Sequence, residues 1–207
     1  MTEPTRRTPT GAAVLQPEIT SAITDAVLDE LAEHGYGRLS MEAVARRAGV
    51  GKSALYRRWP SKQDMVIAVL SEFSVPLAEI PDTGSLHQDL IATLHAVHDW
   101  LTHPRFATIL PDLTAEAGRN PALAEAIEAT IGRPRRELGA VTLRRAVERG
   151  ELPADTNVEL VLDLLAAPVY WRVSVRHVPI EPGYFDDLAC HLLRALNAAP
   201  RTDHGPR

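Results

Sequence analysis

The sequence contains little cysteine and no long uninterrupted apolar segment. Cys190 is the only cysteine among 207 residues, which excludes an internal disulfide, and no N-terminal stretch joins a basic segment to an apolar core and a small-residue cleavage site. The longest strongly apolar run, Val158 to Val175, is interrupted by charged residues and by Pro168, so it is a poor membrane span. These absences predict a cytoplasmic protein with no membrane partner.

Common enzyme signatures and the alternation typical of strands are also missing. No G-x-S-x-G elbow, P-loop or Gly-rich dinucleotide turn occurs, and carboxylates such as Asp112 and Glu116 lie in ordinary helical or loop contexts. Beyond Pro81, Pro and Gly residues divide the chain into helical segments. We therefore expect an all-α protein of about nine or ten helices, with no catalytic residue, cofactor or metal.

Positive charge is concentrated in one short segment of an acidic chain. The net charge of the chain is −5. The segment from Arg38 to Lys62 contains seven Lys and Arg residues and a single acid, Glu42, so its own net charge is +6 and the rest of the chain carries −11. Such a split would orient the protein on DNA, because phosphate neutralisation supplies salt-dependent, sequence-independent affinity. The alternative is that these cations form only a solvated face.

The same segment is patterned as two short helices around a tight turn. Ser40 can cap a helix from about Met41 to Ala48, and Gly49 suits a turn that needs a positive φ. A second helix is predicted from about Lys52 to Trp59, where Pro60 stops it. This is the outline of a helix-turn-helix that reads DNA, in which side chains near the start of the second helix reach base edges.

Short residue groups in and around these helices resemble the signature of a known family. They are Gly35–Tyr36, Leu39–Ser40, Val44–Ala45, Ala48–Gly49–Val50, Leu55–Tyr56, Arg58–Trp59 and Ser61–Lys62. In type and spacing they are similar to the TetR family of bacterial transcriptional regulators, over about Pro17 to Leu70. One departure is Gly51, where many members place a Ser or Thr cap.

The resemblance implies a set of DNA contacts. Lys52, Tyr56 and Lys62 would contact phosphates, whereas Ser53, Ala54 and Arg57 would face base edges. The full predicted DNA-binding set is Ser40, Arg46, Lys52, Ser53, Ala54, Tyr56, Arg57 and Lys62.

The predicted organisation is a helix-turn-helix DNA-binding domain followed by a helical regulatory and dimerisation domain. The expected divisions are a disordered arm (1–16), the DNA-binding domain (17–62), a connecting helix (63–79), the regulatory domain (80–198) and a disordered tail (199–207). Pro17 is expected to open the first helix and Ser61 the fourth, which runs to about Glu79. The later predicted helices are Leu86 to Thr102, Pro104 to Ala117, Pro121 to Ile131, Pro134 to Arg149, Thr156 to His177 and Pro182 to Asn197.

The helix predicted from Thr156 to His177 is apolar nearly all round, so it must be covered on both sides. The last helix covers one side, and a second subunit is the natural cover for the other, which predicts a homodimer held by four-helix packing and suited to a palindromic operator. The alternative is a thick monomeric core. The predicted interface residues are Val161, Leu165, Val169, Leu188, Leu192 and Leu196.

The family resemblance also implies a ligand pocket among the middle helices, for a small apolar or aromatic effector. The predicted lining is His95, His98, Trp100, His103, Phe106, Leu110, Tyr170 and Trp171. Each of these residues could equally belong to the core. If the pocket is real, ligand binding favours a conformation in which the fourth helix moves the two DNA-binding domains out of register with successive major grooves.

A metal site is the competing interpretation of part of this set. His95, His98, Asp99 and His103 recur at spacings of three and four, so a helix could present three of them along one face. Polar residues near a pocket mouth explain the cluster without a metal. Three hypotheses follow: a ligand-responsive dimeric repressor, a regulator without a small-molecule effector, and a helical metal-binding or enzymatic protein with a coincidental helix-turn-helix.

Overall fold

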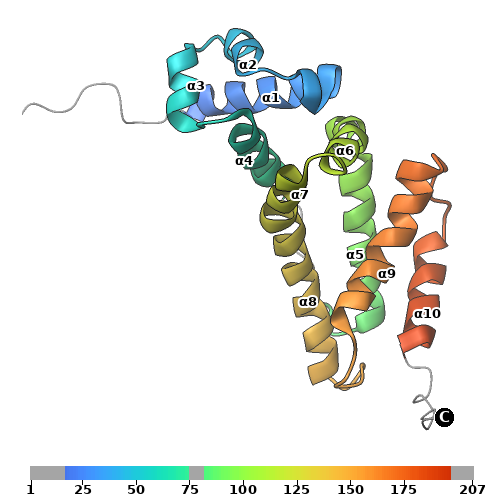
Figure 1. The fold of residues 1–207 in the computed structure, drawn as a ribbon. Helices are drawn as coiled ribbons and strands as arrows, with labels where there is room; N and C mark the ends of the chain where they lie inside the picture. The colour runs from blue at the N-terminus through green and yellow to red at the C-terminus, as the bar shows by residue number, and fades with distance from the viewer. Residues whose placement is uncertain (1–16, 75–81, 197–207) are drawn as a thin grey trace, which may run out of the picture.

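The computed structural model describes residues 17–74 and 82–196, and within these ranges every regular element is helical (Figure 1). The all-α prediction is therefore confirmed. The predicted arm, the end of the connecting helix and the tail lie outside the described residues. The helices are α1 (Pro17–Arg38), α2 (Met41–Arg47), α3 (Lys52–Arg58), α4 (Lys62–Ser74), α5 (Leu86–Thr102), α6 (Pro104–Ala117), α7 (Pro121–Ile127), α8 (Arg133–Glu148), α9 (Val158–Tyr170) and α10 (Tyr184–Leu196).

The local signals predicted for the helix-turn-helix are present. The Ser40 hydroxyl accepts a hydrogen bond of 3.1 Å from the Ala43 N–H and so caps α2. Gly49 adopts a φ of 67° in the turn between α2 and α3. Helix α1 packs across both, and fully buried Val27, Val44 and Leu55 form the centre of this three-helix unit.

The helix break predicted between Ile131 and Pro134 is wrong because proline is accommodated by a π-helical turn. A break was expected between Ile131 and Pro134, but α7 continues into α8 through the π-helical turn η2 (Glu128–Gly132), in which the Arg133 N–H bonds to the Glu128 carbonyl. The wider turn suits Pro134, which has no N–H and would clash with the carbonyl four residues earlier in a regular α-helix. Pro168 likewise precedes the turn η3 (Trp171–Val175), which extends α9.

The described helices bury their apolar faces in two clusters that do not follow the predicted domain boundary. The first combines α1 to α4 with side chains of α6, α7 and η2, and the second lies among α5, α8, α9 and α10. Trp100 and Leu110 pack against both clusters. No helix in the described ranges is long and apolar enough to cross a bilayer.

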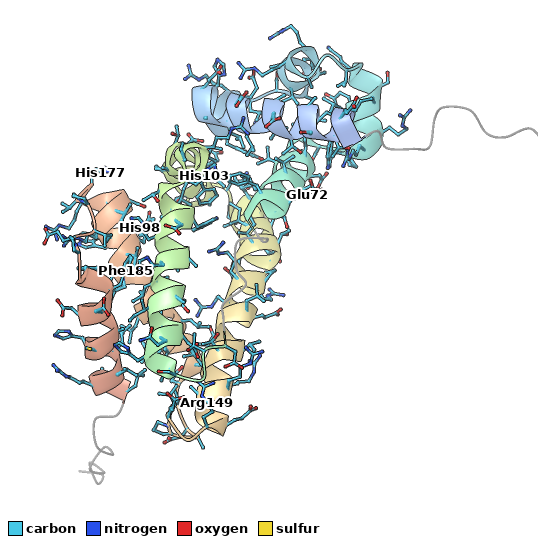
Figure 2. The ribbon with its side chains drawn as sticks, turned by 180° about the vertical axis from the view of Figure 1, so that it is seen from behind. Glu72, His98, His103, Arg149, His177 and Phe185 are labelled. Atoms are coloured by element: carbon cyan, nitrogen blue, oxygen red, sulfur yellow. The ribbon has the colours of Figure 1, made fainter. Side chains whose placement is uncertain are left out.

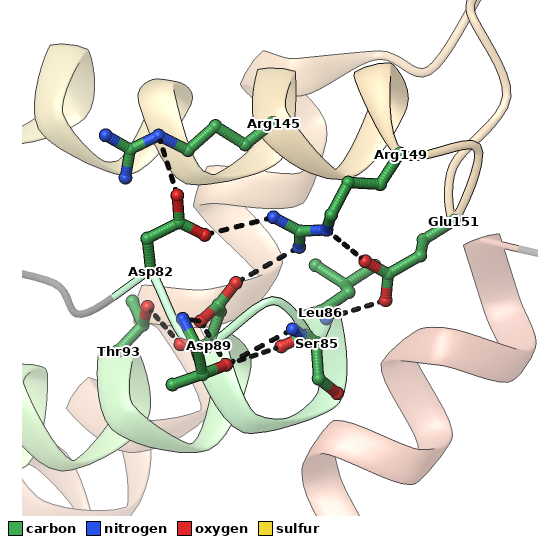
Figure 3. A network of polar contacts seen from close by, with 9 residues as sticks. Asp82, Ser85, Leu86, Asp89, Thr93, Arg145, Arg149 and Glu151 are labelled. Carbon is green, nitrogen blue, oxygen red and sulfur yellow. Dashed lines mark hydrogen bonds and ion pairs between the residues drawn. The ribbon is translucent and has the colours of Figure 1, made fainter.

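A polar network joins the start of α5 to the end of α8 (Figure 3). Asp89 is only 1% exposed, and its carboxylate pairs with Arg149 at 3.2 Å and accepts the Thr83 hydroxyl at 2.6 Å. Arg149 also pairs with Asp82 at 3.1 Å and with Glu151 at 2.5 Å. The Glu151 carboxylate accepts the Leu86 N–H at 2.7 Å, and this bond, with the Arg149 guanidinium, lowers the pKa of Glu151. This network lies at the end of the molecule opposite the helix-turn-helix (Figure 2).

Candidate functional site

The outer face of α3 is an exposed polar surface of the helix-turn-helix. Ser53, Tyr56 and Arg57 are exposed on it, whereas Leu55 is fully buried and fixes the helix on α1 and α2. Ala54 is half-buried. The residues predicted to face base edges therefore lie on or beside one accessible face, where a duplex can reach them.

The two predicted phosphate contacts on α3 share an acidic partner on α2. The Lys52 ammonium lies 3.2 Å from the Glu42 carboxylate, and the Tyr56 hydroxyl lies 3.5 Å from the same oxygen. The pKa of Glu42 is lowered mainly by a hydrogen bond to its own backbone, and then by Lys52 and Tyr56. These contacts hold the cation and the phenol side by side, and a phosphate at this point would replace Glu42 as their acceptor.

Besides Lys52, four of the seven clustered cations contact other parts of the DNA-binding domain. Arg47 pairs with three carboxylates of α1, at 2.5 Å from Glu33, and the pairing lowers the pKa of Glu33. Arg58 donates to the Thr20 hydroxyl at 3.0 Å and lies over the Trp59 ring. The other two contacts are those of Arg38 with the His34 carbonyl and of Lys62 with the Tyr36 carbonyl and ring. Charge counting therefore overstated the surface that is available to DNA.

Arg46 and Arg57 differ from these four. Both are exposed, and neither has a hydrogen-bond or ion-pair partner among residues 17–74 and 82–196. Lys62, predicted to reach a phosphate, is half-buried with its ammonium on the Tyr36 carbonyl at 2.9 Å. An ammonium has three N–H donors, so this contact leaves donors for a phosphate.

A polar contact between α6 and the end of α1 joins the regulatory domain to the helix-turn-helix. Asp112 of α6 accepts the Tyr36 N–H at 2.7 Å. Gly35 makes the close approach possible, because its φ is 73° and an added Cβ would lie 2.7 Å from the Asp112 carboxylate. Arg105 adds ion pairs to Asp25 at 2.7 Å and to Asp29 at 3.2 Å. Sequence reasoning placed Asp112 in an ordinary context and missed this junction.

The regulatory domain contains a cavity of about 120 Å³ between α5, α8 and α9. Its lining residues are Thr93, Ala96, Val97, Arg135, Arg136, Gly139, Leu162, Leu165 and Ala166. None of the eight predicted ligand residues is among them. A signal existed in the sequence, because small residues on three helices leave room between them, but their alignment depends on how the helices pack.

The eight predicted ligand residues lie in three separate places. His95 and His98 pack edge-on against Phe185 and line an open groove of about 380 Å³ beside α10 (Figure 2). Tyr170 is half-buried in the second cluster, and Trp171 is exposed. Trp100, His103, Phe106 and Leu110 lie where α4, α5 and α6 meet.

This aromatic junction contains buried polar atoms without partners. The indole N–H of Trp100 and Nδ1 of His103 are buried, and neither has a hydrogen bond in the described part of the chain. The Trp100 ring lies 4.1 Å from Phe106 and carries the Arg135 guanidinium at 4.1 Å. The His103 ring lies 4.8 Å from Phe73 of α4. The junction therefore connects one end of the cavity to the helix that leads to the DNA-binding domain.

The residues predicted for the dimer interface are mostly inside the chain's own core. Val161, Leu165, Val169 and Leu192 are buried, so they cannot form a surface for a second subunit, while Leu188 and Leu196 are half-buried. The phase of the helix was misassigned, because an apolar pattern on all sides does not tell which side faces inward. The large apolar side chains exposed on α9 and η3 are Leu160, Leu164, Trp171 and Val175.

The competing metal interpretation finds no support in the geometry. His103 faces Phe73, whereas His95 and His98 lie against Phe185, so the predicted row is divided between two surroundings. Within the described ranges, no group of three His, Cys, Asp or Glu side chains is arranged to hold a metal ion.

Comparisons with known proteins cover both parts of the chain. The profile of bacterial regulatory proteins of the tetR family matches residues 23–69, and the profile of the tetracyclin repressor-like C-terminal domain matches residues 80–192. The chain is 30% identical, over 85% of its length and 92% of the relative's, to the DNA-binding transcriptional repressor TetR of Mycobacteroides abscessus. It is 33% identical, over 72% of its length and 73% of the relative's, to an uncharacterized HTH-type transcriptional regulator of Mycobacterium tuberculosis.

Solved structures agree with these matches. The TetR family transcription regulator SCO0332 superposes with a TM-score of 0.68 at 32% identity, covering 85% of this chain and 97% of that one. Salmonella enterica GusR, at 21% identity, gives a TM-score of 0.72 over 89% and 98% of the two chains, which is a likeness of fold.

Proposed function

Since this chain belongs to the TetR family and is a helix-turn-helix transcriptional regulator, we propose that it acts as a homodimeric, ligand-responsive repressor of a palindromic operator. The observation that carries the proposal is the accessible face of α3. Ser53 and Arg57 are exposed there, where base edges can be read, and Lys52 and Tyr56 lie beside them for phosphate contact.

The dimer proposal rests on the exposed apolar stripe of α9 and η3. Leu160, Leu164, Trp171 and Val175 recur at spacings of four and seven, so they lie along one side of the helix. Trp171 is 59% exposed and Leu160 is 52% exposed, which is unfavourable for large apolar side chains in water. A second copy that covers the stripe with its own would remove both from solvent and place two α3 helices on one duplex.

Replacing Leu164 by Glu should break this dimer. Leu164 is 37% exposed on α9, so a carboxylate there would be buried without a partner in the dimer yet tolerated in the monomer. Light scattering should then report a monomer at micromolar concentration, whereas the unaltered protein is a dimer. Leu138 on α8 is 39% exposed and is the matched control, because Leu138→Glu should leave the dimer intact. A dimer that survives Leu164→Glu contradicts this interface.

The ligand response rests on the path from the cavity to the DNA-binding domain. Helix α5 lines the cavity, and its C-cap residue His103 contacts Phe73 of α4. Helix α6 follows and holds the end of α1 through Asp112. An effector that spreads α5 from α8 would shift these contacts and separate the two α3 helices from successive major grooves. A regulator without an effector remains the alternative, and ligand titration of a bound operator distinguishes the two.

The decisive experiment is selection of binding sites from a random duplex library at near-physiological salt. The proposal predicts a palindrome whose half-sites are about one helical turn apart. Lys52→Ala should weaken binding to the selected palindrome and to other duplexes alike, and should lower the salt dependence of the affinity. Arg57→Ala should in addition relax the preference for the palindrome. Salt-sensitive binding to all duplexes without enrichment would leave the cations as an electrostatic surface alone.

A further inference from the structure

We propose that Asp112 of α6 positions Lys62 for its phosphate contact, and that it acts through Tyr36 at the end of α1. The inference rests on the proposed function, because it names a residue of the regulatory domain on which a DNA contact depends. The resemblance to the TetR signature assigns Lys62 to a phosphate and assigns nothing to Asp112. The role of Asp112 follows from the contacts on the two sides of Tyr36.

The kink in α1 joins the backbone of Tyr36 to α6. Gly35 leaves helical geometry, with a φ of 73° and a ψ of 168°, so the N–H that follows it can bond outside the helical ladder of α1. That N–H donates to Asp112 at 2.7 Å. A Cβ added to Gly35 would lie 2.7 Å from the same carboxylate, so Asp112 fits closely against the kink. This charge-assisted hydrogen bond fixes the position of Tyr36.

The carbonyl and the ring of Tyr36 hold the side chain of Lys62. The Lys62 ammonium donates to the Tyr36 carbonyl at 2.9 Å and lies 4.4 Å from the centre of the Tyr36 ring. Tyr36 is 5% exposed, and burial raises its pKa, so the phenol is neutral and its ring face attracts the cation. No carboxylate in the described ranges pairs with this ammonium, so Tyr36 alone aligns it there.

A lysine that is already held binds a phosphate better than one that is mobile. A free lysine side chain loses rotamer freedom when it is ordered on a phosphate, and this loss weakens binding. Lys62 is ordered before DNA arrives, and two of its three N–H donors remain for phosphate oxygens. Its alignment depends on Tyr36, and that of Tyr36 on Asp112. A shift of α6 relative to α1 therefore changes a phosphate contact although α6 itself does not contact the duplex.

Nuclear magnetic resonance of the full chain tests the positioning directly. Lys52 and Lys62 are the only lysines in the sequence, so lysine-selective isotope labelling gives two sets of side-chain signals. The ring of Tyr36 should shift the Lys62 set upfield, and Lys62→Met identifies that set by removing it. Asp112→Ala should move it toward the values of a free lysine and leave the Lys52 set in place. Asp112→Asn keeps an acceptor oxygen for the Tyr36 N–H and should preserve both sets. A Lys62 set that is unchanged by Asp112→Ala overturns the proposal.

Anisotropy titrations of labelled duplexes over a range of salt concentrations measure the effect on DNA binding. The probes are the selected palindrome and an unrelated duplex. Lys62→Met should reduce the dependence of log affinity on log salt by about 0.9 per subunit. Asp112→Ala should weaken binding to both duplexes by about threefold or more, and Asp112→Asn by less than about twofold. Asp112→Ala combined with Lys62→Met should bind as Lys62→Met alone does. An equal loss from Asp112→Ala with and without Lys62 overturns the proposal.

Glu116 of α6 is the matched control for charge. After burial, its carboxylate is the next cause of the raised pKa of Tyr36, but it pairs with Arg119 at 2.8 Å. Net charge alone would make both Asp112→Ala and Glu116→Gln bind DNA more tightly, because each removes a charge that repels phosphate. Positioning predicts weaker binding for Asp112→Ala and no weakening for Glu116→Gln. Tighter binding by Asp112→Ala, or equal weakening by the two variants, overturns the proposal.

Thermal melts by circular dichroism establish that each variant folds. If Asp112→Ala does not, Gly35→Ala decides the outcome, because the added Cβ displaces Asp112 without removing it. It should move the Lys62 signals in the same direction, and unchanged signals overturn the proposal. Selection of a palindrome by a protein whose Lys62 signals do not depend on Asp112 refutes the positioning and leaves the proposed function intact. Salt-sensitive binding to every duplex without a selected palindrome, but with Lys62 and Asp112 coupled, refutes the proposed function and leaves the positioning intact.

Discussion

The two ends of the regulatory domain differ in whether the buried polar groups compared here have hydrogen-bond or ion-pair partners. At the end far from the helix-turn-helix, Asp89 is matched by Arg149 and Thr83, and Glu151 by Arg149 and Leu86. At the near end, the indole N–H of Trp100 and Nδ1 of His103 are buried without hydrogen bonds in the described ranges. Helix α8 extends from one end to the other, since Arg135 is in its first turn and Arg149 is its C-cap.

This difference indicates where the domain can move. Breaking a matched buried network leaves charges without partners, so the far end resists rearrangement. At the near end, Trp100 and His103 lose no hydrogen bond within the described ranges when their side chains shift, and a ligand or a new packing can satisfy the indole N–H and Nδ1. The far end therefore serves as an anchor, and adjustment is concentrated beside the DNA-binding domain.

Replacing Arg149 should cause the largest loss in the free energy of unfolding among the variants that test this comparison. Arg149→Met leaves the carboxylate of Asp89 buried without its cation, and we expect the free energy of unfolding to fall by about 3 kcal/mol. Urea denaturation measures it. Arg119→Met is the control, because the Arg119–Glu116 pair is exposed and should contribute less than about 1 kcal/mol. Similar losses from the two variants would mean that the far end is not an anchor.

Substitutions of two glycines should test the near end, with an intermediate effect on the free energy of unfolding. Gly35 and Gly49 have φ values of 73° and 67°, but only at Gly35 would a Cβ meet another side chain, the carboxylate of Asp112. Gly49→Ala should lower the free energy of unfolding by about 1 kcal/mol, from the positive φ alone, and Gly35→Ala by about 2 kcal/mol or more. Equal losses of unfolding free energy in urea denaturation would show that Asp112 of α6 moves away from the added Cβ at little cost.

The smallest effect is expected at Trp100. Trp100→Phe removes an N–H that has no partner in the described ranges and keeps a ring beside Phe106, so the lost packing and the relieved polar group should nearly cancel. The free energy of unfolding should change by less than about 1 kcal/mol. A loss comparable to that of Arg149→Met would mean that the near end is held as firmly as the far end.

The sequence predicted those parts of the fold that depend on neighbouring residues. Ser40 and Gly49 act through the backbone beside them, and the bounds of α5 and α6 follow from Pro104 and the flanking turns, so these predictions are confirmed. The break expected before Pro134 was wrong because a π-helical turn accommodates proline without ending the helix. The choice between a break and a wider turn is decided by packing, which a local pattern does not contain.

The candidate sites divide in the same manner. The face of α3 is continuous in sequence, so the resemblance to the TetR signature could assign its residues one by one. The cavity draws on α5, α8 and α9, and its small residues align only when those helices pack. For α9 the sequence indicated an apolar helix but not which side faces inward. The predicted dimer interface therefore contained Val161 and Leu165, which are buried, and omitted Leu160 and Leu164, which are exposed.

The first core cluster has a consequence for how such a regulator can be divided. The apolar interior around the helix-turn-helix is completed by Phe106, Ile109, Leu113, Leu123 and Ile131, which come from α6, α7 and η2. A fragment that ends at α4 would expose the surface these side chains cover. The DNA-reading part is therefore not an exchangeable cassette, and a chimera that grafts it onto another regulator must carry α6 and α7 with it or rebuild their inner faces.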